Sequence, residues 1–187
     1  YNDLLSCYRE IEDYQNALKF GYKALEYLPD QTVASFMKKL TLGFISSVYE
    51  RNNQLDSAEY YALKSYNFDN TWHWSGLKLT LGNIYLKLRQ RDKAFAYYKK
   101  RILIAENQLI YIDLIDIYNK MSVEYETMGL LDSAFYYAKK SVNIVGVENY
   151  LEGHVRAISQ LARIYEKLGN ADSTISLLKK EVLLRNQ

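Results

Sequence analysis

The residue types that most often carry chemistry are scarce in this chain. Its 187 residues include two histidines, His73 and His154, and a single cysteine, Cys7. No Ser–His–Asp arrangement, HExxH motif or glycine-rich phosphate loop accompanies them. We interpret the histidines as surface or helix-end residues and Cys7 as a small packed hydrophobe. We therefore expect no catalytic residues, no metal site, no cofactor and no enzymatic activity.

A strip of basic residues offers a second kind of chemistry. Between Lys87 and Arg101 lie seven basic residues, Arg91 among them, and only Asp92 opposes them. Such a strip could contact phosphates, which makes a nucleic-acid-binding helical repeat one alternative. The preferred interpretation is a solvated helix face, because the net charge of the chain is only +2. We expect no nucleic acid partner.

Both tryptophans of the chain, Trp72 and Trp74, stand in one short segment. The preferred interpretation is that they cover a seam between two helical repeats. As an exposed aromatic platform they would instead suit a small molecule, a glycan or a peptide, since amphipathic rings are favoured contact residues. A ligand-sensing domain is therefore the second alternative.

Tyrosines recur at a regular spacing that points to the underlying fold. The recurring tyrosines, which follow one another at nearly constant intervals, are Tyr8, Tyr49, Tyr85, Tyr125 and Tyr165. A small residue follows each of them nine positions later, at Ala17, Ala58, Ala94, Ala134 and Thr174. Such a period is typical of solenoids, in which each helical repeat buries its apolar face against its neighbours.

Composition supports a helical, core-forming chain. Hydrophobic residues make up 49% and charged residues 25% of the sequence, which has one proline and eight glycines. So few helix breakers predict mostly helix with short turns. No run of 18 apolar residues occurs, so we expect no membrane contact from this segment.

The first repeat resembles the tetratricopeptide repeat. The residues that carry the resemblance have the family's spacing and are Tyr1, Leu4, Tyr8, Tyr14, Ala17, Ala24 and Pro29. The second small residue of the pattern is replaced in later repeats by Ser65, Arg101, Ser141 and Glu181. The resemblance implies an all-α, right-handed superhelix of stacked antiparallel helix pairs, with about five repeats and about ten helices. We expect a single array with repeats over residues 1–30, 31–69, 70–106, 107–146 and 147–187.

The turn within each helix pair and the length of the period give finer expectations. Gly or Asn, as at Asn53, Gly129 and Gly169, should close the first helix in a left-handed conformation. The usual tetratricopeptide period is about 34 residues, and the period here is mostly longer. The extra length should extend the first helices of repeats two, four and five, through the stretches 31–41, 108–118 and 148–158. The third repeat should be nearer the standard length.

The resemblance also implies where a partner would bind, because first helices line a concave groove in this family. The groove positions implied are Asn2, Ser6, Arg9, Leu40, Gly43, Ser47, Glu50, Leu79, Asn83, Leu86, Asp116, Asn119, Val123, Glu126, Arg156, Ser159, Arg163 and Glu166. We select eight of them as the binding site for a protein or peptide segment: Ser47, Glu50, Asn83, Leu86, Asn119, Val123, Glu126 and Arg163. Trp72, Trp74, Lys87 and Arg91 are secondary candidates. Replacing Asn83 and Asn119 with alanine should leave stability nearly unchanged and weaken binding.

Long repeats with a Leu-Asp-Ser-Ala turn look like those of bacterial regulators and sensors. This looser resemblance implies a non-catalytic interaction module, the sensing or scaffold region of a larger signalling protein or transcriptional regulator. The resemblance implies that such a region lies in the cytoplasm or the periplasm. In some of these proteins a membrane segment outside the repeats anchors the chain. We accordingly expect the chain to be a fragment of a longer protein.

The last helix is unusually apolar for the end of an array. The apolar residues concerned are Ile175, Leu177, Leu178, Val182, Leu183 and Leu184. Terminal repeats need a polar outer face to remain soluble. We expect this surface to be covered by a further helix or by self-association through the C-terminal helix.

Overall fold

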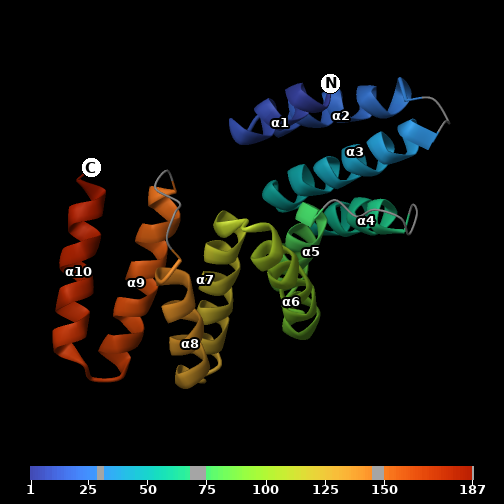
Figure 1. Cartoon of the computed structure of the whole chain (residues 1–187). Helices are drawn as coiled ribbons and strands as arrows, with labels where there is room; N and C mark the ends of the chain where they lie inside the picture. The colour runs from blue at the N-terminus through green and yellow to red at the C-terminus, as the bar shows by residue number, and fades with distance from the viewer. Residues whose placement is uncertain (29–31, 68–74, 145–149, 187) are drawn as a thin grey trace. The chain divides into compact units, whose positions relative to one another are not determined.

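The computed structural model describes residues 1–28, 32–67, 75–144 and 150–186 (Figure 1). These residues form ten helices and no strand, which confirms the predicted all-α fold class. The helices are α1 (Asn2–Glu10), α2 (Tyr14–Glu26), α3 (Thr32–Arg51), α4 (Leu55–Tyr66), α5 (Ser75–Lys87), α6 (Arg91–Gln108), α7 (Tyr111–Thr127), α8 (Leu131–Val142), α9 (Leu151–Lys167) and α10 (Ala171–Arg185).

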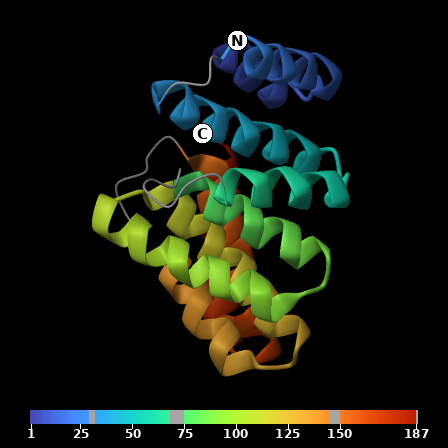
Figure 2. The same cartoon turned by 90° about the vertical axis from the view of Figure 1, so that its right-hand side faces the viewer.

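The chain divides into two compact units. The first unit is Tyr1–Arg101 and the second is Ile102–Gln187, so the division falls within α6. In the first unit α1 pairs with α2 and α3 with α4, as Figures 1 and 2 both show. In the second unit α7 pairs with α8 and α9 with α10 (Figure 1). The repeat boundaries expected from the sequence stay a prediction.

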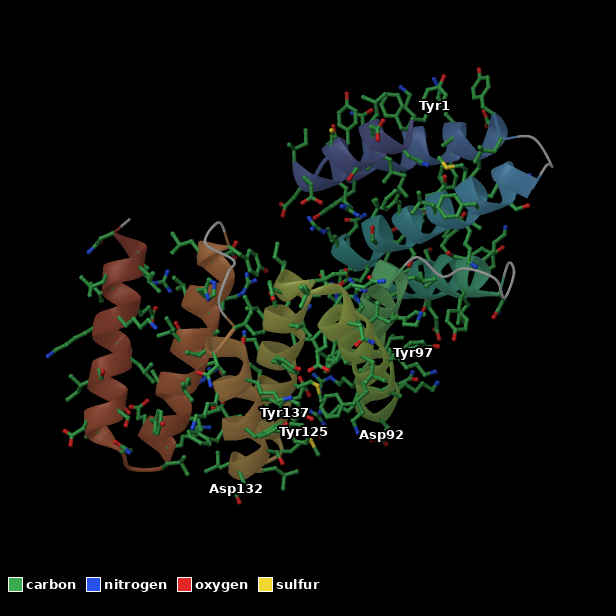
Figure 3. The ribbon with its side chains drawn as sticks, viewed as in Figure 1. Tyr1, Asp92, Tyr97, Tyr125, Asp132 and Tyr137 are labelled. Atoms are coloured by element: carbon green, nitrogen blue, oxygen red, sulfur yellow. The ribbon has the colours of Figure 1, made fainter. Side chains whose placement is uncertain are left out.

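Four of the five recurring tyrosines stack on an aromatic ring from the second helix of the same pair, always at the same sequence offset. The ring centroids lie 5.4–5.6 Å apart and the planes are within 14° of parallel in Tyr8–Phe20, Tyr49–Tyr61, Tyr85–Tyr97 and Tyr125–Tyr137. Figure 3 shows Tyr125 and Tyr137 lying together. The fifth repeat has Leu177 at this place, and Leu177 packs into the same core cluster as Tyr165. We call the five recurring tyrosines the ladder tyrosines.

The ladder tyrosines occupy equivalent inward faces of the first helices. Tyr85 is buried and the other four are half-buried. Beneath the stacks, the small residues of the first four repeats, Ala17, Ala58, Ala94 and Ala134, are fully buried. Small side chains at these positions let the two helices of a pair approach closely. Thr174 of the fifth repeat is half-buried.

Serine hydroxyls join the paired helices in the second and fourth repeats. Ser46 donates to the Ala58 carbonyl at 2.7 Å, and Ser122 donates to the Ala134 carbonyl at 2.8 Å. Ser65 in turn donates to the carbonyl oxygen of Lys39 at 2.8 Å, and Ser141 does the same with Ile115 at 2.9 Å. All four serines are fully buried. The serines that replace the second small residue are therefore satisfied polar core residues.

The turn within each pair has one repeated geometry. The backbone carbonyl of each ladder tyrosine accepts a hydrogen bond from the backbone amide five residues later, which closes the turn. In the second repeat, for example, the Gln54 amide donates to the Tyr49 carbonyl at 2.9 Å. The residue before that amide is left-handed, and the predicted Asn53, Gly129 and Gly169 have φ of 57°, 75° and 74°. Glu12 and Arg89 also adopt this conformation, with φ of 61° and 59°. In the first and third repeats, the turn thus imposes a left-handed backbone on residue types that do not favour it. The sequence did not predict these two left-handed residues.

The helix lengths confirm one part of the sequence interpretation and correct another. The first helices α3, α7 and α9 have 20, 17 and 17 residues, whereas α5 has 13. The stretch 108–118, however, is not one helix. The second helix of the third repeat, α6, runs for 18 residues to Gln108, and Leu109 then takes φ of 55° before α7 begins at Tyr111.

Three residues discussed from the sequence, Trp72, His73 and Trp74, lie outside the described residues, as does Pro29. The predicted aromatic cover or platform at the second repeat seam therefore stays a prediction.

We predict that the Tyr125–Tyr137 stack contributes coupling energy beyond the area that each ring buries. A double-mutant cycle with Tyr125→Leu and Tyr137→Leu should give about 0.5–1.5 kcal/mol of coupling in urea unfolding. The control is Leu103→Ala, since Leu103 is 64% exposed on α6. That change should alter the unfolding free energy by less than about 0.5 kcal/mol. A coupling near zero would show that the stack is only apolar contact.

Candidate functional site

In the first unit, the side chains of two predicted groove residues bind other residues of the same chain. Ser47 is 8% exposed and accepts a hydrogen bond from Arg9 Nη1 at 3.0 Å. Glu50, also 8% exposed, forms an ion pair with Lys87, with Nζ 2.7 Å from Oε1. Lys87 Nζ also donates to the Glu50 carbonyl at 2.7 Å. Both groups hold neighbouring first helices together.

The other two predicted residues of the first unit are also part of the fold. Asn83 Oδ1 accepts a hydrogen bond from the hydroxyl of Tyr98 at 2.9 Å, and Tyr98 is fully buried. Leu86 is half-buried on α5. The expectation that Asn83 is irrelevant to stability is therefore wrong, because it accepts from a buried hydroxyl.

Ion pairs recur where the first helices of successive repeats end. Glu10 lies 3.3 Å from Arg51, and in the same way Glu50 pairs with Lys87. In the second unit, Glu126 pairs with Lys167 at 2.8 Å. These charges sit one or two positions after a ladder tyrosine, so the repeat itself brings them together.

The second unit gathers several predicted groove residues around one cavity of about 410 Å³, which we call the arginine pocket. Its lining comes from α7, α9 and α10 and comprises Asn119, Val123, Arg156, Ser159, Gln160, Arg163 and Arg185. Three of the eight selected residues, Asn119, Val123 and Arg163, thus share one pocket. Glu126, a fourth, adjoins it through its contacts with Arg163 and Gln160.

Each arginine of the pocket is positioned by an acidic residue. Arg156 Nη2 lies 3.0 Å from Asp116 Oδ1, and Arg185 Nη2 lies 2.8 Å from Glu181 Oε1. Arg163 Nε lies 3.3 Å from Glu126 Oε2. The guanidinium groups are therefore oriented before any ligand arrives, and the pocket is polar without a strong net charge.

Glu126 is the most enclosed charge beside the pocket. Its side chain is 7% exposed and contacts Lys167, Arg163 and Gln160, whose Nε2 donates to Glu126 Oε2 at 2.7 Å. Burial alone would raise the pKa of Glu126, but the hydrogen bonds from Lys167 and Gln160 and the nearby positive charges lower it below its ordinary value. Glu126 is thus held ionised and anchors two basic side chains.

Asn119 is different from the other polar residues of the pocket. Its side-chain oxygen is buried and has no hydrogen-bond donor among the described residues. Leaving a buried acceptor unsatisfied costs about 1–3 kcal/mol, so native proteins seldom retain one without a reason. Among the pocket residues, Asn119 is therefore the one whose side-chain hydrogen bonding the described residues leave incomplete.

Several residues of the basic strip are buried or have partners within the chain. Lys87 is paired with Glu50, and Arg101 is buried with 3% exposure. The ammonium of Lys93 lies 5.0 Å from the Tyr85 ring centroid, and that of Lys100 lies 5.4 Å from the Tyr97 centroid. Arg91 is exposed at the start of α6. The solvated-face interpretation accounts better for these positions than a phosphate-binding strip.

In the part of the chain that the structure describes, no three His, Cys, Asp or Glu side chains are grouped as metal ligands. None of its described helices is long and apolar enough to cross a membrane.

Comparison with known proteins agrees with the geometry of the helix pairs. The tetratricopeptide repeat family matches residues 76–108, which span α5 and α6. The match thus covers one helix pair of the chain. No curated protein sequence matches this chain.

Several solved structures resemble nearly the whole chain. BtubC (BKLC) from P. vanneervenii has a TM-score of 0.79 at 15% identity, covering 98% of this chain and 77% of that one. MamA has a TM-score of 0.69 at 20% identity, covering 100% and 96%. The TPR-like repeats of a kinesin light chain-like protein from Podosopora anserina have a TM-score of 0.70 at 14% identity, covering 98% and 92%. These similarities confirm the tetratricopeptide fold that the repeat spacing predicts.

Two lining residues of the arginine pocket were missed by sequence reasoning. Gln160 follows the predicted Ser159 and reaches towards Glu126 from within the core, where it is 2% exposed. Arg185 comes from the second helix α10, which the tetratricopeptide groove pattern does not include. The repeat pattern carries no signal for either one.

We predict that Asn83→Ala destabilises the protein by about 1–3 kcal/mol, because it removes an acceptor from the buried Tyr98 hydroxyl. Asn107→Ala is the matched control, since Asn107 is exposed on α6 and should change stability by less than about 0.5 kcal/mol. Chemical denaturation measures both. Adding Tyr98→Phe to Asn83→Ala should recover part of the loss, and no recovery would contradict this explanation.

We predict that Glu126 makes stability dependent on acid pH. Because its folded pKa is lowered, its contribution is present above the ordinary glutamate pKa and is lost as pH falls through the folded value. Glu126→Gln should lower stability by about 1–2 kcal/mol at neutral pH and flatten the acid dependence.

The control for this prediction is Glu152→Gln. Glu152 is 79% exposed in its pair with Arg156, so the change should have an effect of less than about 0.5 kcal/mol. Urea unfolding between neutral and acid pH compares the three proteins. Parallel pH profiles for wild type and Glu126→Gln would contradict the assignment.

Proposed function

We propose that this chain is a non-catalytic protein-interaction module that holds an extended peptide segment at the arginine pocket of its second unit. The tetratricopeptide fold is generally such a module, and the repeat match supports this class of function. The observation that carries the proposal is the buried Asn119 oxygen without a donor among the described residues, in a cavity that also holds three oriented arginines.

The chemistry of the pocket suits a peptide. A backbone N–H would satisfy Asn119, while Arg156 and Arg163 can donate to backbone or side-chain oxygens. Val123 and the aliphatic parts of the arginine side chains supply apolar contact. The remaining selected residues, Ser47, Glu50, Asn83 and Leu86, support the first unit and are not proposed as ligand contacts.

We further propose that the module is the sensing or scaffold region of a larger bacterial regulatory protein. Support comes from the looser resemblance noted above, which rests on the long repeats and their Leu-Asp-Ser-Ala turn. Sequencing the gene on both sides of this segment tests it. A membrane helix or a DNA-binding or kinase module in the same reading frame would support it, and an unrelated catalytic domain would count against it.

We predict that Asn119→Ala weakens peptide binding while leaving stability unchanged or slightly higher. The lost hydrogen bond should cost about 0.5–1.5 kcal/mol, or roughly two- to tenfold in affinity. Removing a buried acceptor that has no donor among the described residues should not destabilise the fold. Peptides selected from a displayed random library on the wild-type chain serve as the probe, with affinity measured by fluorescence anisotropy.

Asn107→Ala is again the control and should bind these peptides like the wild type. Arg163→Gln should also weaken binding, because Arg163 lines the pocket. Selection of no peptide, or equal affinity for Asn119→Ala and wild type, would exclude the pocket as the binding site.

A further inference from the structure

The first helix of the chain has an apolar outer face that the equivalent helices bury. Tyr1 and Leu4 are 50% and 43% exposed. Cys7 is also exposed, so its interpretation as a packed small hydrophobe is wrong. Counting from the ladder tyrosines, their equivalents in α9 are Ile158, Leu161 and Ile164, which are 2%, 6% and 0% exposed. In α9 these residues are buried in the second unit, where Leu161 and Ile164 pack in one core cluster with α8.

The last helix, α10, also has an exposed apolar face whose equivalent on an earlier helix is buried. Ile175, Leu178 and Val182 on α10 are 51%, 47% and 57% exposed. Their equivalents on α8 are Phe135, Ala138 and Val142, which are half-buried or buried and pack in the cluster with Leu161 and Ile164. Figure 1 shows α10 at the edge of the second unit, with α9 as its neighbour.

The exposed face of α10 is therefore equivalent to the face of α8 that packs against α9. In the same way, the exposed face of α1 is equivalent to the face of α9 that packs against α8. We propose that these two faces bind each other between copies of this chain, so that α1 of a second copy packs on α10 of the first. The contact would continue the α8–α9 interface across two molecules. It is head-to-tail, and it leaves one α1 face and one α10 face free at the ends of any open assembly.

Side-chain volumes at the two faces support this pairing. Leu178 is larger than the equivalent Ala138, whereas Cys7 is smaller than the equivalent Ile164. A large residue on α10 would thus meet a small one on α1, and an α1-type helix fits α10 without overfilling the contact.

The charges at the helix ends also agree. Glu10 and Arg51 stand at equivalent positions in successive first helices and lie 3.3 Å apart. The same register would place Lys167 at the end of α9 beside Glu10 of the second copy. Within one chain Lys167 already pairs with Glu126, and Glu10 with Arg51. The contact between copies would therefore bring two existing ion pairs together, with opposite charges adjacent to each other.

The test measures molar mass by light scattering after size-exclusion chromatography, over a wide range of protein concentration and with a thiol reductant present. Wild-type mass should rise with concentration. Leu4→Glu blocks the α1 face and Leu178→Glu blocks the α10 face, so each variant alone should have the mass of one chain. Leu103→Glu is the control, because Leu103 is 64% exposed on α6 and should associate like the wild type.

An equimolar mixture of Leu4→Glu and Leu178→Glu decides the geometry. Each variant keeps one intact face, so the mixture should form dimers and stop there. If Leu4→Glu unfolds by circular dichroism, Cys7→Glu replaces it, since Cys7 is exposed on the same face.

Three results would overturn the proposal. The first is a wild-type chain that remains a monomer at every concentration, which would assign these faces to other partners. The second is normal self-association of Leu4→Glu, which would indicate a symmetric contact between two α10 helices. The third is association that disappears under reductant, which would indicate a Cys7 disulfide.

Discussion

The close packing of two helices over one small residue is the interaction on which the rest of this structure depends. A fully buried alanine lets the second helix approach the first, and the ladder tyrosine then reaches an aromatic ring on that second helix. Each stack contributes about 0.5–1.5 kcal/mol beyond apolar burial. The short turn follows from the same packing, because the tyrosine's carbonyl accepts the amide that closes the turn. The same arrangement places the ion pairs that join successive first helices one or two positions after a ladder tyrosine.

Most of the fold could be predicted from the sequence because its determinants repeat. The period of the tyrosines located the helix pairs, and Asn53, Gly129 and Gly169 located three turns. Glu12 and Arg89 escaped prediction, since neither residue type favours a left-handed backbone and only the packing of the pair imposes it. The extension of α6 also escaped, because helical spacing continues through Leu109 and does not show where one helix stops.

The site was less predictable than the fold. Counting along first helices identified Asn119, Val123 and Arg163, which do share a pocket. The same count selected Glu50 and Asn83, whose partners Lys87 and Tyr98 lie within the protein. A sequence position can show that a side chain lies on a face, but whether a neighbour already satisfies it depends on distances. Arg185 illustrates the converse case, a pocket residue that the count did not select. It lies on a second helix, and the groove pattern includes first helices alone.

The second and fourth repeats share more than a fold. Ser46, Ser65 and the Tyr60–Tyr61 pair recur two repeats later as Ser122, Ser141 and Tyr136–Tyr137, and the adjacent rings have the same separation of 5.1 Å and angle of 83°. The serines donate to equivalent carbonyls in both places. The two repeats therefore share one set of internal hydrogen bonds and one geometry of adjacent rings. At the positions of Asn119 and Val123, which line the arginine pocket in the fourth repeat, the second repeat has Gly43 and Ser47. The helix pair thus requires particular residues at its internal positions, whereas it accepts different residue types at these two positions of the first helix.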